Sequence, residues 1–392
     1  MARERIIIAL DPGTTKTCAL AVRIGGGAPH VIGAARAASA GIRKGVVSDL
    51  KSSAASIAEA AAKACRAAGI RCDRAWLAVS GEQVEGQVTR AKVMPAGAQV
   101  RRQDLDACLR AAVEAARLPP GREVLHVLPG EFVLDGQAAV ASPLGMACRA
   151  MQVDAYLVTA PSAALDNLER SVEAAGLVME HEVAAALAAA WAATDQAERL
   201  AGALVIDIGA AATDFIAFRD GQVALVGCLG IAGAHVTRDV SLGLRVQLGE
   251  AERLKREHAA ALARLVPASE LQLASGERAG RWFLAEIVEA RMREIMELVR
   301  DRVRAARLRP PLVALTGGEA RLAGAADLAQ EVFDCPARVG PAPGPQSIGV
   351  ARDPVWAVAL GIARYAAEQD APPSRKDAGF RPALRWLREW FT

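Results

Sequence analysis

Long apolar runs and a strong charge bias are both missing from this sequence of 392 residues. A membrane-spanning helix needs about 20 apolar residues, and the most apolar internal stretch, VAAALAAAWAA at 183–193, is much shorter and predicts a buried alanine-rich helix. The apolar run that follows the first charged residues and ends before Asp11 has only five residues, too few for the core of a signal peptide. The net charge of +3, with no basic patch interleaved with aromatics outside the last residues, argues against nucleic acid as a partner.

Cysteine and histidine are sparse, and neither is arranged for a disulfide framework or a metal site. The seven cysteines are scattered, odd in number and never spaced as C-x-x-C, which indicates reduced thiols in a cytosolic protein. None of the five histidines pairs with cysteines or carboxylates at metal-ligand spacing. We therefore expect no metal site built from side chains alone.

The sequence does contain one strand-turn-strand pattern twice. RIIIALDPGTTKTCALAVRIGG predicts an apolar strand, a tight turn with glycine and a second strand, and GALVIDIGAAATDFIAFRDG at 202–221 repeats this pattern. Both turns fit D-x-G-x-x-x-T, and Asp207 follows Asp11 by 196 residues (207 − 11), half the chain. Either turn alone fits an ordinary β-turn. Two in register indicate a duplication that produced two similar lobes.

Turns of this kind suit a phosphate group. Gly13 and Gly209 allow the backbone to turn sharply and to bring its N–H groups toward an anion. In the first turn, two threonines and a lysine follow the glycine and add hydroxyl donors and a cation. Asp11 and Asp207, each at the end of a predicted strand, can hold Mg²⁺ through water.

Two further motifs fit a nucleotide. PLVALTGGEARLAG at 311–324 predicts a strand that runs through Gly317 and Gly318 into a helix, whose N-terminal N–H groups can bind a phosphate or a ribose. Alone, this piece fits a structural corner equally well. GEAERLKRE at 249–257 places Glu252 and Lys255 on one helix face, which by itself fits a solvated ion pair.

The last residues, FRPALRWLREWFT at 380–392, predict a strongly amphipathic helix. Pro382 lies in its first turn, where the missing N–H removes no hydrogen bond. The segment is too short to span a bilayer, so we expect it to lie in the membrane interface; packing on its own domain or on a neighbouring subunit is the alternative. The residues predicted to meet the membrane are Phe380, Leu384, Trp386, Leu387, Trp390 and Phe391, with Arg381, Arg385 and Arg388 on the opposite face.

Taken in order, the two turns, the A-E-x-x-K helix and the Gly-Gly corner resemble the actin-like ATPase superfamily. Five further segments resemble one family within this superfamily. These segments are GIRKGVVSDL (41–50), LAVSGEQV (77–84), VLHVLPGEFVLDG (124–136), SPLGMACRAMQVDAYLVTA (142–160) and LAEIVEARMREIMELV (284–299). With these and the amphipathic end, the chain resembles the FtsA family of bacterial cell-division proteins over nearly its full length.

The resemblance implies an α/β fold of two actin-like lobes, each ribonuclease-H-like, that bind ATP between them. Asp207, through water, and Asp11 would lie near Mg²⁺, while Glu252 and Lys255 would contact the ribose and adenine. The implied cofactor-binding residues are Asp11, Gly13, Thr14, Thr15, Lys16, Asp207, Gly209, Thr213, Glu252, Lys255, Gly317 and Gly318. The implied domains are a first lobe (1–81, 161–200 and 346–370), an inserted βαββ subdomain (82–160), a second lobe (201–345, helical tip 233–305), a linker (371–379) and a membrane-targeting helix (380–392).

The resemblance also implies partners and a location. The partners are the FtsZ C-terminal peptide, other divisome proteins, further copies of the chain in a polymer and anionic inner-membrane lipids. The implied location is the cytoplasmic side of the inner membrane at the division septum. Arg281 and Arg291 are the candidates for the FtsZ peptide, because arginine binds carboxylates with forked donors; a solvated arginine-rich helix face is the alternative.

The second turn, DIGAAATD, departs from the family pattern, which has further glycines. Ala210 and Ala211 disfavour positive φ and limit how closely the backbone approaches a γ-phosphate. Glu182 is a poor match to a water-activating residue. We therefore expect ATP binding with slow or negligible hydrolysis. The alternatives are an assembly ATPase of another system, such as PilM of pilus assembly, and a kinase of the acetate or sugar kinase branch, for which we find neither a catalytic aspartate motif nor a sugar-pocket motif.

Overall fold

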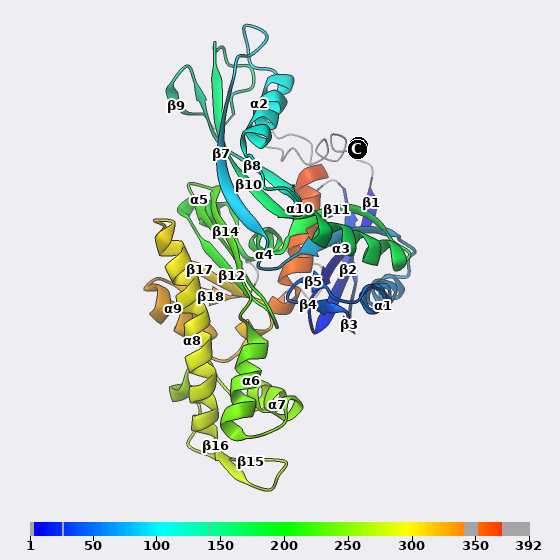
Figure 1. The fold of residues 1–392 in the computed structure, drawn as a ribbon, viewed down its shortest axis with the longest axis vertical. Helices are drawn as coiled ribbons and strands as arrows, with labels where there is room; N and C mark the ends of the chain where they lie inside the picture. Colours follow the sequence, from blue (N-terminus) through cyan, green and yellow to red (C-terminus); the bar gives the residue numbers. More distant parts are fainter. Residues whose placement is uncertain (1–3, 26, 141, 341–351, 371–392) are drawn as a thin grey trace.

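The computed structural model describes residues 4–25, 27–140, 142–340 and 352–370. The predicted linker at 371–379 and the predicted membrane helix at 380–392 lie outside the described residues. Figure 1 shows two lobes side by side, an inserted subdomain at the top and a helical extension at the bottom. Buried apolar side chains form three clusters: one fills the first lobe and extends to Val205 and Ile216 of the second, one fills the rest of the second lobe, and one fills the insert.

The first lobe is built on a five-stranded sheet. β1 and β2 form the predicted hairpin, with Asp11 opposite Cys18, and β3 continues it in the antiparallel sense. On the other side of β1 the strands run parallel. Helices α1 (Leu50–Ala68) and α3 (Ser162–Ala174) pack together beside this sheet. The strands, in sheet order, are β11 (Val178–Ala184), β6 (Arg74–Val79), β1 (Arg5–Pro12), β2 (Lys16–Ile24) and β3 (His30–Ala38).

The second lobe repeats this plan. β12 and β13 form the second predicted hairpin, with Asp207 opposite Asp214, and β14 extends it in the antiparallel sense while β17 and β18 add in parallel. The duplication inferred from the two D-x-G turns is therefore present as two sheets of the same order. The strands, in sheet order, are β14 (Gln222–Leu229), β13 (Thr213–Arg219), β12 (Leu204–Ile208), β17 (Val313–Thr316) and β18 (Ala337–Val339).

The insert consists of one helix on a four-stranded antiparallel sheet. Its order along the chain is the expected β, α, β, β, with one additional short strand, β9, between the last two. Apolar residues of α2 (Arg102–Ala115), among them Leu105, Cys108 and Leu109, are buried in the core of this subdomain. The strands, in sheet order, are β7 (Glu85–Val93), β10 (Met151–Pro161), β8 (Arg122–Leu134) and β9 (Gln137–Val140).

The helical extension of the second lobe is formed by α6 (Gly233–Leu244), α7 (Leu248–His258) and the long α8 (Arg281–Ala305). Every third or fourth residue of α8 is buried, as the amphipathic period requires. The remaining elements here and in the sheet region are η1 (Ala263–Leu265), β15 (Glu270–Gln272), β16 (Arg278–Gly280), η2 (Glu319–Arg321), α9 (Ala325–Phe333) and α5 (Gln196–Ala201).

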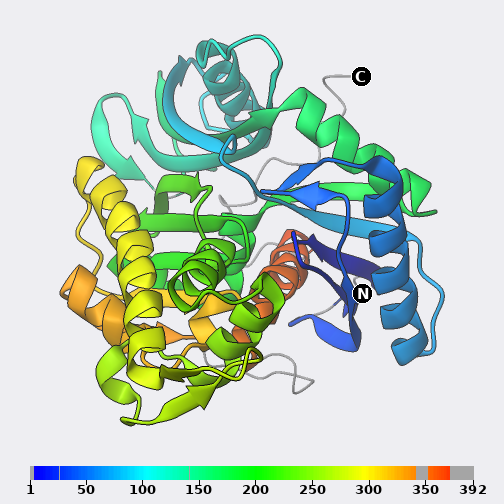
Figure 2. The ribbon, with the colours of Figure 1, turned by 60° about the horizontal axis from the view of Figure 1, so that its bottom comes forward.

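Two helices pack against each other between the lobes. The predicted alanine-rich helix is α4 (Ala185–Ala193), buried on nearly every residue, and it packs against α10 (Ala357–Asp370), which follows η4 (Pro354–Trp356). Figure 2 shows α10 between the green strands of the second lobe and the blue sheet of the first. Small alanine side chains allow this close packing. Among the described residues, no helix combines the length and the apolar character needed to cross a membrane.

Candidate functional site

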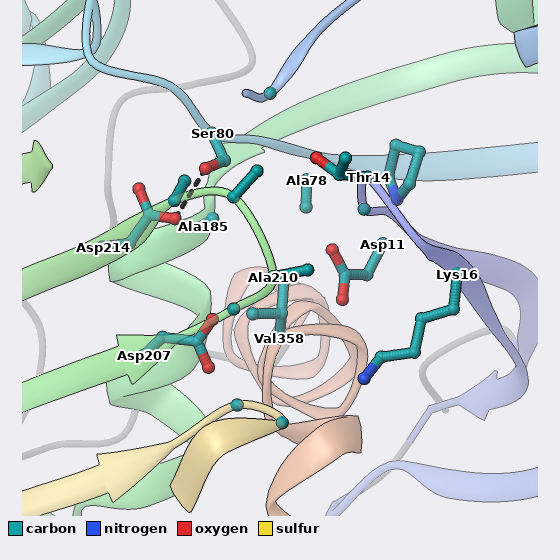
Figure 3. A pocket seen from close by; sticks show the side chains of 18 of the residues that line it. Asp11, Thr14, Lys16, Ala78, Ser80, Ala185, Asp207, Ala210, Asp214 and Val358 are labelled. Carbon is teal, nitrogen blue, oxygen red and sulfur yellow. Dashed lines mark hydrogen bonds between the residues drawn. The ribbon is translucent and has the colours of Figure 1, made fainter. Parts of the chain in front are cut away.

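A cleft of about 780 Å³, partly open to solvent, lies between the lobes where the two hairpin turns face each other. Figure 3 shows Asp11, Thr14 and Lys16 reaching into it from the first lobe, and Asp207, Ala210 and Asp214 from the second. Nine of the twelve predicted cofactor residues line it, and they are Asp11, Gly13, Thr14, Thr15, Lys16, Asp207, Gly209, Gly317 and Gly318. Thr213, Glu252, Lys255 and the weak candidate Glu182 are not among the residues that line it.

The two turns have the same backbone geometry. The Gly13 N–H donates to the Lys16 carbonyl oxygen at 3.0 Å, and the Gly209 N–H donates to the Ala212 carbonyl oxygen at 3.0 Å. A Cβ at either glycine would lie 3.0 Å from that same carbonyl oxygen, so a side chain would crowd the turn. Lys16 and Ala212 are themselves 196 residues apart (212 − 16), which extends the repeat to the loop interior.

The side chains of the two loops differ. Thr14, Thr15 and Lys16 supply two hydroxyls and an ammonium group, whereas the corresponding residues of the second loop are all alanine. Neither Ala210 nor Ala211 is among the described residues with positive φ, as expected of residues that carry a Cβ. The second loop offers N–H groups and methyl groups to a ligand, without a hydroxyl or a cation.

Three carboxylates converge on the cleft. Burial, together with the nearby Asp207 carboxylate, raises the pKa of Asp11 to about 7. Burial also raises the pKa of Asp214 to about 7, and the hydrogen bond from Ser80 opposes this rise. Burial raises the pKa of Asp207. The Thr316 hydroxyl donates to Asp207 Oδ1 at 2.6 Å, and this hydrogen bond opposes the rise. The cleft therefore gathers three carboxyl groups whose negative charge a divalent cation would stabilise.

Within the described ranges, no group of three or more carboxylate, histidine or cysteine side chains could by itself hold a metal ion. Asp11 and Asp207 nevertheless fit a magnesium ion that arrives with a nucleotide, because such an ion keeps several waters and uses few protein ligands. Those two aspartates would hold its hydration shell, and the ion would neutralise phosphate charge.

The Gly-Gly corner closes the cleft on the side of the second lobe. Gly317 has φ +88°, and a Cβ there would lie 2.3 Å from the Ile208 carbonyl oxygen, so only glycine fits. Its N–H donates to the Pro354 carbonyl oxygen at 3.0 Å. A Cβ at Gly318 would lie 3.4 Å from Lys16 Nζ, which places this first-lobe ammonium group across the cleft from its own turn.

Lys255 is buried and fully hydrogen-bonded. Its ammonium donates to the Gly233 carbonyl oxygen at 3.3 Å and lies 2.8 Å from Glu319 Oε1 and 2.9 Å from Glu252 Oε2. An ammonium has three N–H donors, so all are used. The expected pair of Glu252 and Lys255 forms, but the alternative of a solvated pair is wrong because Lys255 is only 2% exposed. A nucleotide contact by Lys255 would require one of these partners to be exchanged.

Sequence reasoning missed two polar side chains that line the cleft, those of Ser80 and Asp214. The Ser80 hydroxyl donates to Asp214 Oδ2 at 2.6 Å, across the two lobes (Figure 3). Asp214 directly follows Thr213, whose own hydroxyl donates to the Ile231 carbonyl oxygen at 2.7 Å and so faces the protein interior. Asp214 lies directly opposite Asp207 in the β12–β13 hairpin, and opposite residues of an antiparallel pair share a face, so the hairpin pairing could have identified it.

The two candidate arginines of the helical extension are partly exposed and already bonded. Arg281, the first residue of α8, donates to the His258 carbonyl oxygen at 2.7 Å. Arg291 donates to Asp239 Oδ2 at 2.5 Å and also pairs with Glu294. Beside Arg281, Trp282 and Phe283 are 52% and 47% exposed, an aromatic pair that sequence reasoning did not select.

Two family models match the chain. The model described as "Cell division protein FtsA" matches residues 204–361, and the model described as "SHS2 domain inserted in FTSA" matches residues 81–159. The cell division protein FtsA of Pseudomonas aeruginosa is 32% identical, over 98% of this chain and 97% of its own length.

Solved structures of other proteins show a similar fold. A chain of the PilM-PilN type IV pilus biogenesis complex superposes with a TM-score of 0.64 at 19% identity, covering 92% of this chain and 98% of that one. MreB5 of Spiroplasma citri bound to ADP superposes with a TM-score of 0.52 at 14% identity, covering 91% and 94%. These identities show the actin-like fold alone, so the PilM alternative is not favoured. The two family models and the relative of 32% identity show that this chain belongs to the FtsA family of bacterial cell-division proteins.

Proposed function

We propose that the chain is a cell-division protein that binds ATP with Mg²⁺ in the cleft and, as a polymer, tethers FtsZ filaments to the cytoplasmic membrane. The observation that carries the nucleotide part is the pair of matching turns, Gly13 to Lys16 and Gly209 to Ala212, on opposite walls of one cleft. N–H groups from both walls can surround a polyphosphate. The ADP bound to MreB5, which shares the fold, supports this assignment.

Hydrolysis in this proposal is slow or negligible. The first loop offers hydroxyls and the Lys16 ammonium to the phosphates, but the alanines of the second loop offer only backbone N–H groups, without a hydroxyl or a cation to stabilise the charge that develops on a γ-phosphate. ATP then acts as a structural ligand that biases the angle between the lobes and thereby the surfaces available to further copies of the chain.

The FtsZ partner is assigned to the start of α8. Exposed Trp282 and Phe283 offer apolar surface, and Arg281 and Arg291 offer forked donors to an acidic peptide. Arg291 already pairs with Asp239 and Glu294, so a peptide carboxylate would have to replace one of them. This exchange predicts modest affinity for a single peptide, which a polymer would raise through avidity.

Membrane attachment is assigned to the amphipathic segment at 380–392. Burying each large apolar side chain contributes about 1.5–3 kcal/mol, and each arginine near an anionic leaflet about 1 kcal/mol. Ordering the segment costs about 1–2 kcal/mol per residue, so one copy binds weakly and many copies on a polymer bind firmly. The proposed location is the cytoplasmic face of the inner membrane at the division septum.

Calorimetric titration of the full chain with Mg-ATP tests the nucleotide part. We expect one ATP per chain, and a large loss of affinity for Lys16→Ala, because this change removes the ammonium that lines the cleft beside Gly318. Lys63→Ala, which alters an exposed lysine of α1, is the matched control and should bind as the wild type does. Absence of heat from the folded wild-type chain at millimolar Mg-ATP would refute the assignment.

A further inference from the structure

Three hydrogen bonds join the second lobe to the base of the insert and to the first-lobe segment that leads into it. After β6 the chain passes through Ser80 and Glu82 into the insert; the Ser80 hydroxyl donates to Asp214 Oδ2 at 2.6 Å. Glu82 Oε1 accepts the Gly230 N–H at 3.0 Å. The third bond is buried, where the Val226 N–H donates to the Tyr156 hydroxyl of β10 at 2.7 Å. We refer to these three hydrogen bonds as the root contacts.

All three root contacts meet one element of the second lobe, the hairpin of β13 and β14. Asp214 lies on β13, opposite Cys228 of β14. The two donor amides belong to Val226, which lies on β14 two residues before Cys228, and to Gly230, which directly follows β14. The same hairpin begins directly after the second phosphate turn, Gly209 to Ala212. A displacement of that turn would therefore be transmitted along the hairpin to all three contacts.

The backbone of Ser80 is packed against another segment of the first lobe. A Cβ at Gly45 would lie 2.3 Å from the Ser80 carbonyl oxygen, so the tip of the β4–β5 hairpin (Ile42–Arg43 and Val46–Val47) packs directly on this backbone. Both Gly45 and Ser80 line the cleft. The hydroxyl that crosses to the second lobe thus belongs to a fixed part of the first.

The topology gives these contacts a mechanical consequence. Both ends of the insert are covalently continuous with the first lobe, through β6 and through α3, whereas its attachment to β14 is non-covalent. A change in the angle between the lobes must either break the root contacts or move the insert. Asp214 faces the cleft beside Asp11 and Asp207, so a cation or phosphate there also alters the electrostatic environment of the Ser80 bond.

We propose that Ser80 is a positioning residue through which Mg-nucleotide in the cleft is coupled to the insert, the root contacts tightening when the lobes close on the ligand. This inference rests on the proposed nucleotide binding. It follows that the position of the insert depends on whether nucleotide is bound. A partner that binds the insert should therefore bind the nucleotide-bound chain with a different, higher affinity.

Hydrogen exchange of the full chain, with and without saturating Mg-ATP, tests this coupling. The Val226 and Gly230 amides donate two of the root contacts and report on them directly. In the wild type, Mg-ATP should slow exchange at both by about threefold to tenfold, the change that corresponds to strengthening one hydrogen bond. In Ser80→Ala this slowing should be lost while the turns at 11–17 and 207–213 remain protected by ATP.

Two variants make the experiment decisive. Ser80→Thr keeps a hydroxyl and should restore the response, and Ser53→Ala, which removes the buried Ser53–Ser171 hydrogen bond of 2.8 Å elsewhere in the first lobe, should leave it intact. Protection of the turns without any change at Val226 and Gly230, or an unchanged response in Ser80→Ala, overturns the inference alone. Absence of protection at the turns in the wild type overturns the proposed nucleotide binding and the inference together.

Discussion

Lys255 Nζ lies 2.8 Å from Glu319 Oε1 in the interior of the second lobe, where the two residues are only 2% and 8% exposed. This ion pair joins α7 to the segment that directly follows the Gly-Gly corner. The second oxygen of Glu319 has no hydrogen-bond partner among the described residues. The pair therefore fixes the wall of the cleft but leaves a buried acceptor only partly satisfied.

Breaking this pair on one side should destabilise the chain strongly. Lys255→Met leaves the Glu319 carboxylate buried without its cation, and we expect a loss of about 3–5 kcal/mol in the free energy of unfolding. The double variant with Glu319→Gln should recover most of that loss. Urea unfolding monitored by circular dichroism measures both.

The control for this prediction is Lys63→Met. Lys63 pairs with Glu59 at 2.6 Å on the surface of α1, and loss of an exposed pair costs about 0–1 kcal/mol. If the single and double variants at positions 255 and 319 prove equally unstable, lost packing rather than an unpaired charge explains the effect.

Stability of the nucleotide-free chain should fall as the pH rises from about 4 to about 7. The pKa values of Asp11 and Asp214 are raised on folding from 3.8 to about 7, mainly by burial, so the folded state binds protons that the unfolded state has released. Stability then decreases between pH values of about 4 and 7 and levels off above this window. Asp214→Asn should flatten the decrease and raise the melting temperature at pH 8 by several degrees.

The matched control is Asp220→Asn, which alters an exposed aspartate of the turn between β13 and β14. Its melting temperatures should follow the wild type at pH 5 and pH 8. An Asp214→Asn variant whose melting temperature falls equally at both pH values would contradict the assignment of a buried, proton-binding carboxyl. Adding Mg²⁺ with ATP should reduce the pH dependence, because the cation favours the ionised aspartates.

The Gly-Gly corner should tolerate no side chain. Gly317→Ala puts a Cβ 2.3 Å from the Ile208 carbonyl oxygen at a φ of +88°, and we expect a loss of stability above about 1 kcal/mol together with weaker Mg-ATP binding. Gly249→Ala, in the exposed first turn of α7 with no atom within 4 Å of the new Cβ, should be neutral or stabilising. Equal behaviour of the two variants in thermal unfolding and calorimetry would refute this reading of the corner.

The last segment should control membrane binding without affecting the cleft. Replacing Trp386 and Trp390 by glutamate puts two charges on the apolar face, and we expect the chain to remain in the supernatant when it is sedimented with anionic liposomes. Mg-ATP affinity should stay within a factor of about two of the wild type, since the cleft residues are unchanged. Sedimentation equal to that of the wild type would eliminate the segment as the anchor.

The repeated turns could be predicted from sequence because their signal is local. A strand period, D-x-G-x-x-x-T and an offset of 196 residues lie within short windows, and both hairpins form as expected. The resemblance to a known family allowed the actin-like fold to be predicted as well, together with nine of the residues that line the cleft.

The contacts between residues far apart in the sequence could not be predicted in the same way. Ser80 and Asp214 are 134 residues apart, and Lys255 and Glu319 are 64 apart, so no spacing rule pairs them. The helix spacing correctly paired Glu252 with Lys255 but carried no information on the burial of Lys255, which packing of α7 against the rest of the lobe decides. The turn at Ala210 closes without positive φ at that residue, as a residue with a Cβ favours.

Co-sedimentation of the full chain with FtsZ and anionic liposomes tests the central claim most directly. With Mg-ATP present, we predict that FtsZ enters the liposome pellet only when this chain is added, and that substituting Trp282 and Phe283 by alanine leaves the chain in the pellet while FtsZ returns to the supernatant. FtsZ that stays in the supernatant although the wild-type chain pellets with the liposomes would contradict the tethering role.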